Sequence, residues 1–207
     1  MSYQIITDSC CDLTEAQLKN LQVSCANLTV MYNGENHTSF SEPAAVKAFY
    51  DEIRSGVMAT TAAANPDDWA GIMKPVLEEG RDVLVITFSG GMSTTYQSAV
   101  IASKDLQEEY PQRKIIVLDS LAAALGQGLL VYHACRKRDE GMSIDELAAW
   151  VEENKFHVAH WVTVDDLTHL KRGGRILAVV FAILHSHGKL TFLEALEHLR
   201  CFGASFG

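Results

Sequence analysis

The feature that most constrains the fold is an apolar run that passes directly into a loop of glycine and hydroxyl residues. Residues 83–86 are apolar and mostly β-branched, which is the pattern of a strand buried on both faces. Residues 89–95 then bring serine, glycine and threonine, and apolar residues return at helical spacing from Tyr96. The stretch therefore predicts a strand, a tight loop and the start of a helix.

The loop from Ser89 to Ser93 has the chemistry of an anion-binding site. Backbone N–H groups at a helix start lack internal partners and carry partial positive charge. Gly90 and Gly91 let an anionic group approach closely, and the two serine hydroxyls can donate to it. The loop predicts a receptor for a carboxylate or a phosphate. The alternative is an ordinary strand-to-helix turn with serine and threonine caps and no ligand.

Composition limits the class of protein. The 207 residues allow one large domain or two small ones, and a hydrophobic fraction of 48% supports a core. A net charge of −9 disfavours binding to nucleic acid or anionic lipid. The cysteines lack Cys-x-x-Cys spacing, the N-terminus lacks a signal-peptide pattern, and the longest apolar run, residues 176–184, is too short for a membrane helix. We therefore expect a cytoplasmic protein with no integral membrane segment, no bound metal and no nucleic-acid partner.

Strand and helix signals alternate along the chain, which predicts an α/β fold with a mostly parallel sheet flanked by helices. The predicted strands lie at residues 3–7, 25–31, 83–86, 115–118 and 160–163. Helix starts are predicted at the capping residues Thr14, Asn65 and Ser143 and near Pro43. Pro75 is expected to end or kink the helix that Asn65 begins.

Three of the predicted strands end in acidic or hydroxyl residues. These are Asp8-Ser9, Ser89 and Asp119-Ser120. In open α/β sheets the carboxyl ends of parallel strands share one edge, and ligands bind there. The three strand ends therefore strengthen the prediction of a ligand site at this edge.

Five motifs follow one another along residues 3–176. They are Ile6–Leu13, Thr60–Pro66, Phe88–Ala99, Val117–Ser120 with Gly126–Gly128, and Val164–Ile176. In this order they resemble the motifs of the DegV family, the bacterial fatty-acid-binding proteins. The resemblance implies a two-domain α/β protein that holds a long-chain fatty acid between its domains and delivers it to a separate fatty-acid kinase.

The resemblance also implies where the ligand is held. It implies that the carboxylate is held at Thr61 and at Ser89–Gly90. Together with Gly91 and Ser93 of the predicted anion-binding loop, these are the expected ligand-binding residues, with no catalytic residue and no cofactor. The basic run with Lys171, Arg172 and Arg175 is a candidate contact for a phosphate or a partner, or else a solvated turn. Gly90 stands where the family commonly has a second serine, which removes one hydroxyl.

The end of the chain departs from the family pattern after Ile176. We therefore expect residues 1–158 to form an α/β domain that carries the anion-binding loops, and residues 159–207 to be the remnant of a second, truncated domain that would cover the ligand. Two alternatives to a carrier remain. One is an enzyme that acts on a phosphorylated small molecule at the same loops, with Asp8 or Asp119 as acid or base. The other is a truncated form with impaired ligand binding.

Overall fold

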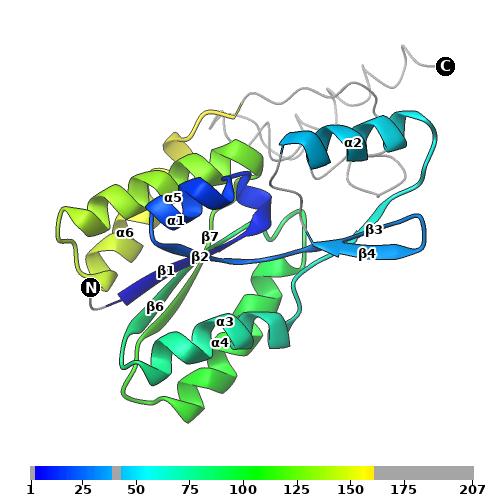
Figure 1. Cartoon of the computed structure of the whole chain (residues 1–207). Coiled ribbons are helices and arrows are strands. Elements are labelled where there is room, and N and C mark those ends of the chain that lie inside the picture. The colour runs from blue at the N-terminus through cyan, green and yellow to red at the C-terminus, as the bar shows by residue number, and fades with distance from the viewer. Residues whose placement is uncertain (1–2, 39–42, 161–207) are drawn as a thin grey trace, which may run out of the picture.

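Four parallel strands form the central sheet, in the order β2–β1–β6–β7 (Figure 1). The computed structural model describes residues 3–38 and 43–160. The four strands are β1 (Tyr3–Asp8), β2 (Val23–Ala26), β6 (Asp82–Thr87) and β7 (Ile115–Asp119). Strand β6 lies inside the sheet and pairs with β1 on one side and β7 on the other. The prediction of an α/β fold built on a parallel sheet is confirmed.

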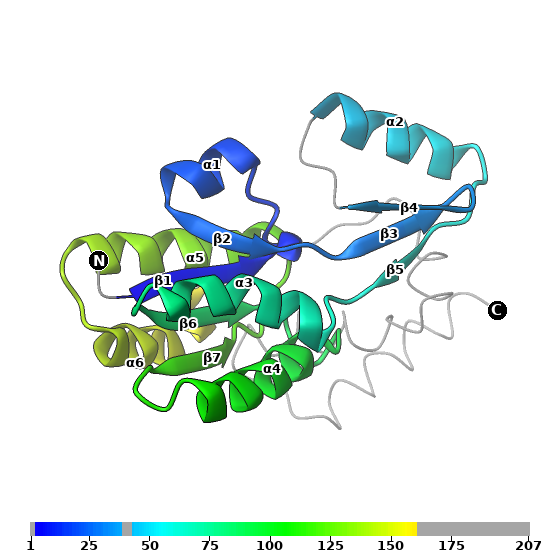
Figure 2. The same ribbon diagram turned by 60° about the horizontal axis from the view of Figure 1, so that its bottom comes forward.

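Helices cover both faces of this sheet (Figures 1 and 2). Alternate side chains of β1 and β6 point to opposite faces, so Ile5 and Leu84 join one core cluster whereas Ile6 and Val85 join the other. The first cluster packs against α1 (Glu15–Asn20), α5 (Ala124–Asp139) and α6 (Ile144–Asn154). The second packs against α3 (Pro66–Glu78) and α4 (Thr95–Glu109). Burial of each such apolar side chain stabilises the fold by about 1.5–3 kcal/mol.

A second, antiparallel sheet projects beyond the carboxyl edge of the first (Figure 2). It has the order β4–β3–β5 and consists of β3 (Thr29–Tyr32), β4 (Glu35–Thr38) and β5 (Thr60–Ala62). Helix α2 (Pro43–Arg54) packs against it, and the rings of Tyr32 and Phe49 meet edge to face with centroids 5.2 Å apart. The single strand predicted at 25–31 is wrong, because the chain leaves the parallel sheet after Ala26 and enters the antiparallel one at Thr29.

The predicted helix starts are confirmed by their capping bonds. Thr14, Asn65 and Ser143 each accept a hydrogen bond from the backbone of the residue three positions on, and each makes a full capping box. Of the two outcomes predicted for Pro75, an end of the helix is wrong, because α3 continues to Glu78, and a kink stays a prediction. Val76 and Leu77 are buried in the core, so packing outweighs the one hydrogen bond that a proline removes.

Several sequence predictions fall on residues that the structure does not describe. The basic run with Lys171, Arg172 and Arg175 lies outside the described residues, as does most of the strand predicted at 160–163. The domain boundary between residues 158 and 159 stays a prediction. Among the described helices, none combines the length and the apolar character that a membrane crossing requires.

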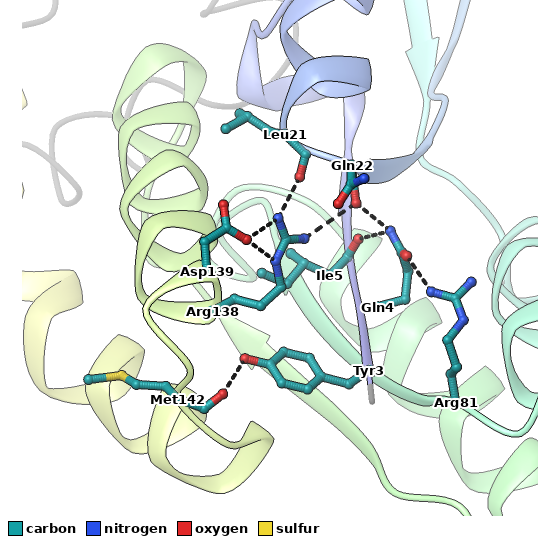
Figure 3. A network of polar contacts seen from close by, with 9 residues as sticks. All are labelled: Tyr3, Gln4, Ile5, Leu21, Gln22, Arg81, Arg138, Asp139 and Met142. Carbon is teal, nitrogen blue, oxygen red and sulfur yellow. Dashed lines mark hydrogen bonds and ion pairs between the residues drawn. The ribbon is translucent and has the colours of Figure 1, made fainter. Parts of the chain in front are cut away.

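The amino edge of the parallel sheet is closed by a network around Arg138 (Figure 3). The buried Arg138 guanidinium donates to the Leu21 carbonyl oxygen at 2.9 Å and forms an ion pair with Asp139. The Tyr3 hydroxyl donates to the Met142 carbonyl oxygen at 2.9 Å. These bonds join the end of α5 to β1 and to the turn before β2. They therefore hold the amino ends of these two strands in place.

We predict that Gly128→Ala destabilises the fold by about 1–3 kcal/mol, because a Cβ at this position would collide with the backbone carbonyl oxygen of Cys11. Gly71→Ala in α3 is the matched control, since a Cβ there meets nothing within 4 Å. Alanine forms helix better than glycine by about 1 kcal/mol, so this control should be as stable as the parent or more stable. Unfolding by urea measures both changes. Equal stabilities of the two variants would contradict the close packing of α5 against residues 9–11.

Candidate functional site

The pairing of the parallel strands brings three chain segments together at the carboxyl edge. Thr7 lies beside Ile86 in the pairing of β1 with β6, and Thr87 lies beside Asp119 in the pairing of β6 with β7. Asp8 ends β1, and the loop with Ser89 begins directly after Thr87. The edge therefore gathers Asp8, the Ser89 loop and Asp119, as the strand-end pattern predicted.

Ser89 is held at this edge by its own backbone. Its N–H donates to the Ala122 carbonyl oxygen at 3.0 Å, and its carbonyl oxygen accepts from Met92 at 3.0 Å and Ser93 at 3.2 Å. Only 5% of the residue is exposed. Its hydroxyl has no hydrogen-bond partner among the residues that the structure describes. The Ser89 hydroxyl therefore has unused hydrogen-bonding capacity, and it is suited to bind a polar group of a ligand.

The amides on either side of Ser89 are bound by carboxylates from the two neighbouring strands. The Phe88 N–H donates to Asp8 Oδ2 at 2.7 Å. The Gly90 N–H is shared by the two carboxylate oxygens of Asp119, each at 3.1 Å. Asp8 and Asp119 thus hold the loop from both sides.

These bonds change the role expected for the backbone of the loop. Protein acceptors already take the N–H groups of Phe88, Ser89, Gly90, Met92 and Ser93. Within the described part of the chain, the Gly91 N–H makes no hydrogen bond. An anion at this loop would therefore meet the Ser89 hydroxyl and the Gly91 amide, rather than the ring of free amides that the helix start suggests.

Ser93 acts locally as a cap for α4. Its hydroxyl oxygen accepts from the Thr95 backbone N–H at 3.3 Å and lies 2.8 Å from the Thr95 hydroxyl oxygen. Thr94, the residue immediately before α4, makes no side-chain cap bond. A direct contact of Ser93 with a ligand stays a prediction.

Thr61 lies on the second sheet and not on a loop of the first. It is exposed in the middle of β5 and pairs with Val30 of β3. Ala64, three residues on, is buried in the cluster that contains Ile6 and Ala26, near the carboxyl ends of their strands. Thr61 therefore lies toward the carboxyl edge of the parallel sheet, as the Ser89 loop does. No hydrogen bond joins the two residues. Its role in ligand binding stays a prediction.

Asp8 is a fully buried carboxyl group. Burial raises its pKa from 3.8 to about 6, because a charged carboxylate loses its hydration. Hydrogen bonds from the Phe88 amide, the Gln127 side chain and the Cys10 amide oppose this rise in the pKa. Gln127 Nε2 also donates to the Thr7 hydroxyl at 3.0 Å, which in turn donates to the Ile86 carbonyl oxygen at 2.8 Å. A continuous buried network therefore lies beneath the loop.

Sequence reasoning noticed the two aspartates as strand ends but missed their function as acceptors for the loop amides. The available signal was the Asp-Ser pair that ends both β1 and β7, the two strands that flank β6. Gln127 stands in the Gly126–Gly128 motif, but its partner Thr7 lies far away in the sequence, so its hydrogen bond had no local signal. Among the described residues, no group of three or more histidine, cysteine or acidic side chains is placed to hold a metal.

The chain matches known proteins over most of its length. The family model described as "Uncharacterised protein, DegV family COG1307" matches residues 2–189. A DegV domain-containing protein of Clostridium perfringens is 40% identical over 182 residues, which are 87% of this chain and 62% of that protein. This chain therefore spans a little over three fifths of the length of that curated relative.

Solved structures of related proteins share the fold. A DegV family protein from Thermus thermophilus, described by its fatty acid binding, is 34% identical with a TM-score of 0.73, over 85% of this chain and 61% of that one. A stearic acid-binding protein from Eubacterium ventriosum is 26% identical with a TM-score of 0.72, over 84% of this chain and 60% of that one. Both matches agree with the parallel sheet and its flanking helices.

We predict that Gly90→Ala destabilises the loop, because a Cβ there would lie 2.8 Å from Asp119 Oδ2 and 3.2 Å from the Tyr96 ring. The expected loss is about 1–3 kcal/mol. Gly91→Ala is the matched control, since its Cβ would lie at an ordinary 3.6 Å from the Ser89 hydroxyl oxygen. Neither glycine has a positive φ, so the expected loss of stability comes only from the close approach of the added Cβ at position 90. A Gly90→Ala variant that melts at the parent's temperature would refute it.

We predict that Asp8 makes the protein more stable at pH 4 than at pH 7. Its pKa of about 6 in the folded state exceeds its ordinary 3.8, so the folded state takes up the proton first as the pH falls. This contribution is full below pH 3.8, falls as the pH rises and is lost above pH 6, with a size of about 3 kcal/mol. Urea unfolding between pH 4 and pH 7 measures it. Asp8→Asn should remove that part of the pH dependence, and parallel curves for parent and variant would contradict the prediction.

Proposed function

Since the chain belongs to the DegV family, we propose that it is a carrier that holds a long-chain fatty acid with its carboxylate at the Ser89 loop. One observation carries the proposal: the hydroxyl of Ser89, a residue that is only 5% exposed, has no hydrogen-bond partner among the described residues and lies at the edge where open α/β sheets bind ligands. The related proteins from Thermus thermophilus and Eubacterium ventriosum, which are described as fatty acid-binding, support it.

The proposed head-group site combines one hydroxyl and one amide. Ser89 Oγ and the Gly91 N–H each donate a hydrogen bond to the carboxylate, and a hydrogen bond to a charged group is worth about 1.5–3 kcal/mol. Gly90 allows the loop to pass close to Asp119. Thr61 and Ser93 complete the proposed set, with Thr61 reaching the ligand from β5. The acyl chain adds about 0.8 kcal/mol for each buried CH₂ group.

In this role the protein performs no chemistry of its own and requires no cofactor. A separate fatty-acid kinase, the partner that the family resemblance implies, would receive the ligand in the cytoplasm. Lys171, Arg172 and Arg175 are the proposed contact for this partner or for its phosphate. The enzyme alternative has less support, because the carboxylates of Asp8 and Asp119 are both occupied by backbone amides.

Native mass spectrometry of the purified protein tests the proposal. We expect a copurified mass that matches a long-chain fatty acid, or else saturable uptake when fatty acids of increasing length are added. A protein that takes up no fatty acid but binds a phosphorylated small molecule would favour the enzyme alternative. A stable protein that takes up neither would identify a form with impaired binding.

We predict that Ser89→Ala weakens fatty-acid affinity by about 10–100-fold, the value of one hydrogen bond to a carboxylate. Ser103→Ala is the matched control, because the Ser103 hydroxyl only donates to the Val100 carbonyl oxygen within α4. Isothermal titration of both variants with the copurified acid gives the two affinities. If Ser89→Ala binds as tightly as Ser103→Ala, the carboxylate is held elsewhere.

A further inference from the structure

Two acidic side chains bind the backbone N–H groups of the residues on either side of Ser89. Asp8 Oδ2 accepts from the amide before it, at Phe88, and both oxygens of Asp119 accept from the amide after it, at Gly90. The two carboxylates come from different strands on opposite sides of β6. The backbone on each side of Ser89 is therefore held independently, and the position of its Cβ, from which the hydroxyl projects, follows from both.

Each carboxylate also holds the chain that follows its own strand. Asp8 Oδ1 accepts from the Cys10 N–H at 3.0 Å, and Asp119 Oδ1 accepts from the Leu121 N–H at 2.9 Å. The same side chain thus joins its own loop to the Ser89 loop. At both positions an acidic residue that ends a strand binds the amide two residues on and one amide from β6's loop.

The arrangement at Asp8 carries a cost in stability when the carboxyl group is charged. The group is fully buried, and burial raises its pKa because it penalises the charged form. At Asp119 the carboxylate lies close to the loop backbone, and a Cβ at position 90 would lie 2.8 Å from Oδ2 unless the Asp119 side chain shifted.

Asp82 shows what the same bond looks like without a ligand site. Its Oδ1 accepts from the Lys114 backbone N–H at 2.9 Å, at the amino end of β6. The bond type and length match the bond from the Leu121 N–H to Asp119, and the side chain is again an aspartate of the parallel sheet. Asp82 therefore serves as a matched control at the opposite end of the same strand.

We propose that Asp8 and Asp119 are positioning residues for the ligand, which act by fixing the Ser89 hydroxyl through the flanking amides of Phe88 and Gly90. This role rests on the proposed binding of a carboxylate at Ser89. Neither aspartate touches the ligand. Loss of either one lets the loop and the hydroxyl move, so affinity falls although Ser89 itself is intact.

The first measurement needs no ligand. Amide hydrogen exchange of the full chain is followed by NMR in the parent, Asp119→Ala, Asp119→Asn and Asp82→Ala. We expect Asp119→Ala to speed exchange at Gly90 and Leu121, and Asp119→Asn, which keeps an acceptor oxygen, to restore part of the protection. Asp82→Ala should speed exchange at Lys114 and leave Gly90 unchanged. Unchanged Gly90 exchange in Asp119→Ala would overturn the proposal.

The second measurement is a double-mutant cycle on fatty-acid affinity. Asp119→Ala alone should weaken binding by about tenfold or more, within the range of one lost hydrogen bond to a charged group. In a chain that already carries Ser89→Ala, the same change should weaken binding by less than about twofold, because the hydroxyl through which it acts is gone. Asp82→Ala should have the same small effect in both backgrounds. Additive effects of Asp119→Ala and Ser89→Ala would overturn the proposal.

Asp8→Asn guards against the failure of one variant to fold. It keeps the size of the side chain and one acceptor oxygen, and its effect on affinity should also vanish in the Ser89→Ala background. If the parent takes up no fatty acid, the proposed function fails, and exchange at Gly90 alone decides whether Asp119 fixes the loop. If the parent binds and exchange at Gly90 is unaltered in Asp119→Ala, the carrier function stands and the positioning role fails.

Discussion

The parallel pairing of β6 with β1 on one side and β7 on the other is the interaction on which the site depends. This register puts Asp8 and Asp119 next to the two ends of the loop that follows Thr87. A shift of one residue would turn every side chain of a strand to the other face, which would exchange Ile5 with Ile6 in the two core clusters. Packing of the helices on both faces therefore sets the register, and the register sets the loop.

Much of the main sheet could be predicted from the sequence, because its strands are buried on both faces and its helices begin with explicit caps. The run at 83–86 and the capping boxes at Thr14 and Ser143 are local signals that the structure confirms. The second sheet could not be predicted in the same way. Its strand Glu35–Thr38 is polar and largely exposed, and nothing local marks the change of sheet between Ala26 and Thr29. The rule that proline ends a helix failed at Pro75, because the burial of Val76 and Leu77 stabilises the last turn of α3.

The candidate site also has one part that local sequence signals predict and one part that depends on tertiary structure. Ser89 and its glycines were identified from residue types in one short loop, which is information that a sequence contains directly. The acceptors of the flanking amides lie on other strands, so their identity depends on tertiary pairing. The helix start suggested free amides for an anion, whereas the structure uses most of them internally. The proposed site, with one remaining hydroxyl and one amide, is small and directional, which suits a carboxylate better than a group that needs many donors.

Gly90 has a consequence for how this chain can change by mutation. In the DegV motif that the loop resembles, a serine commonly stands at this position, and such a residue brings both a hydroxyl and a Cβ. In this chain the Cβ would lie 2.8 Å from Asp119 Oδ2, so a serine at position 90 requires the Asp119 side chain to shift. Gly90→Ser is therefore not a simple return to the family's residue. The effect of residue 90 depends on the side-chain conformation at 119, and the two positions are epistatic.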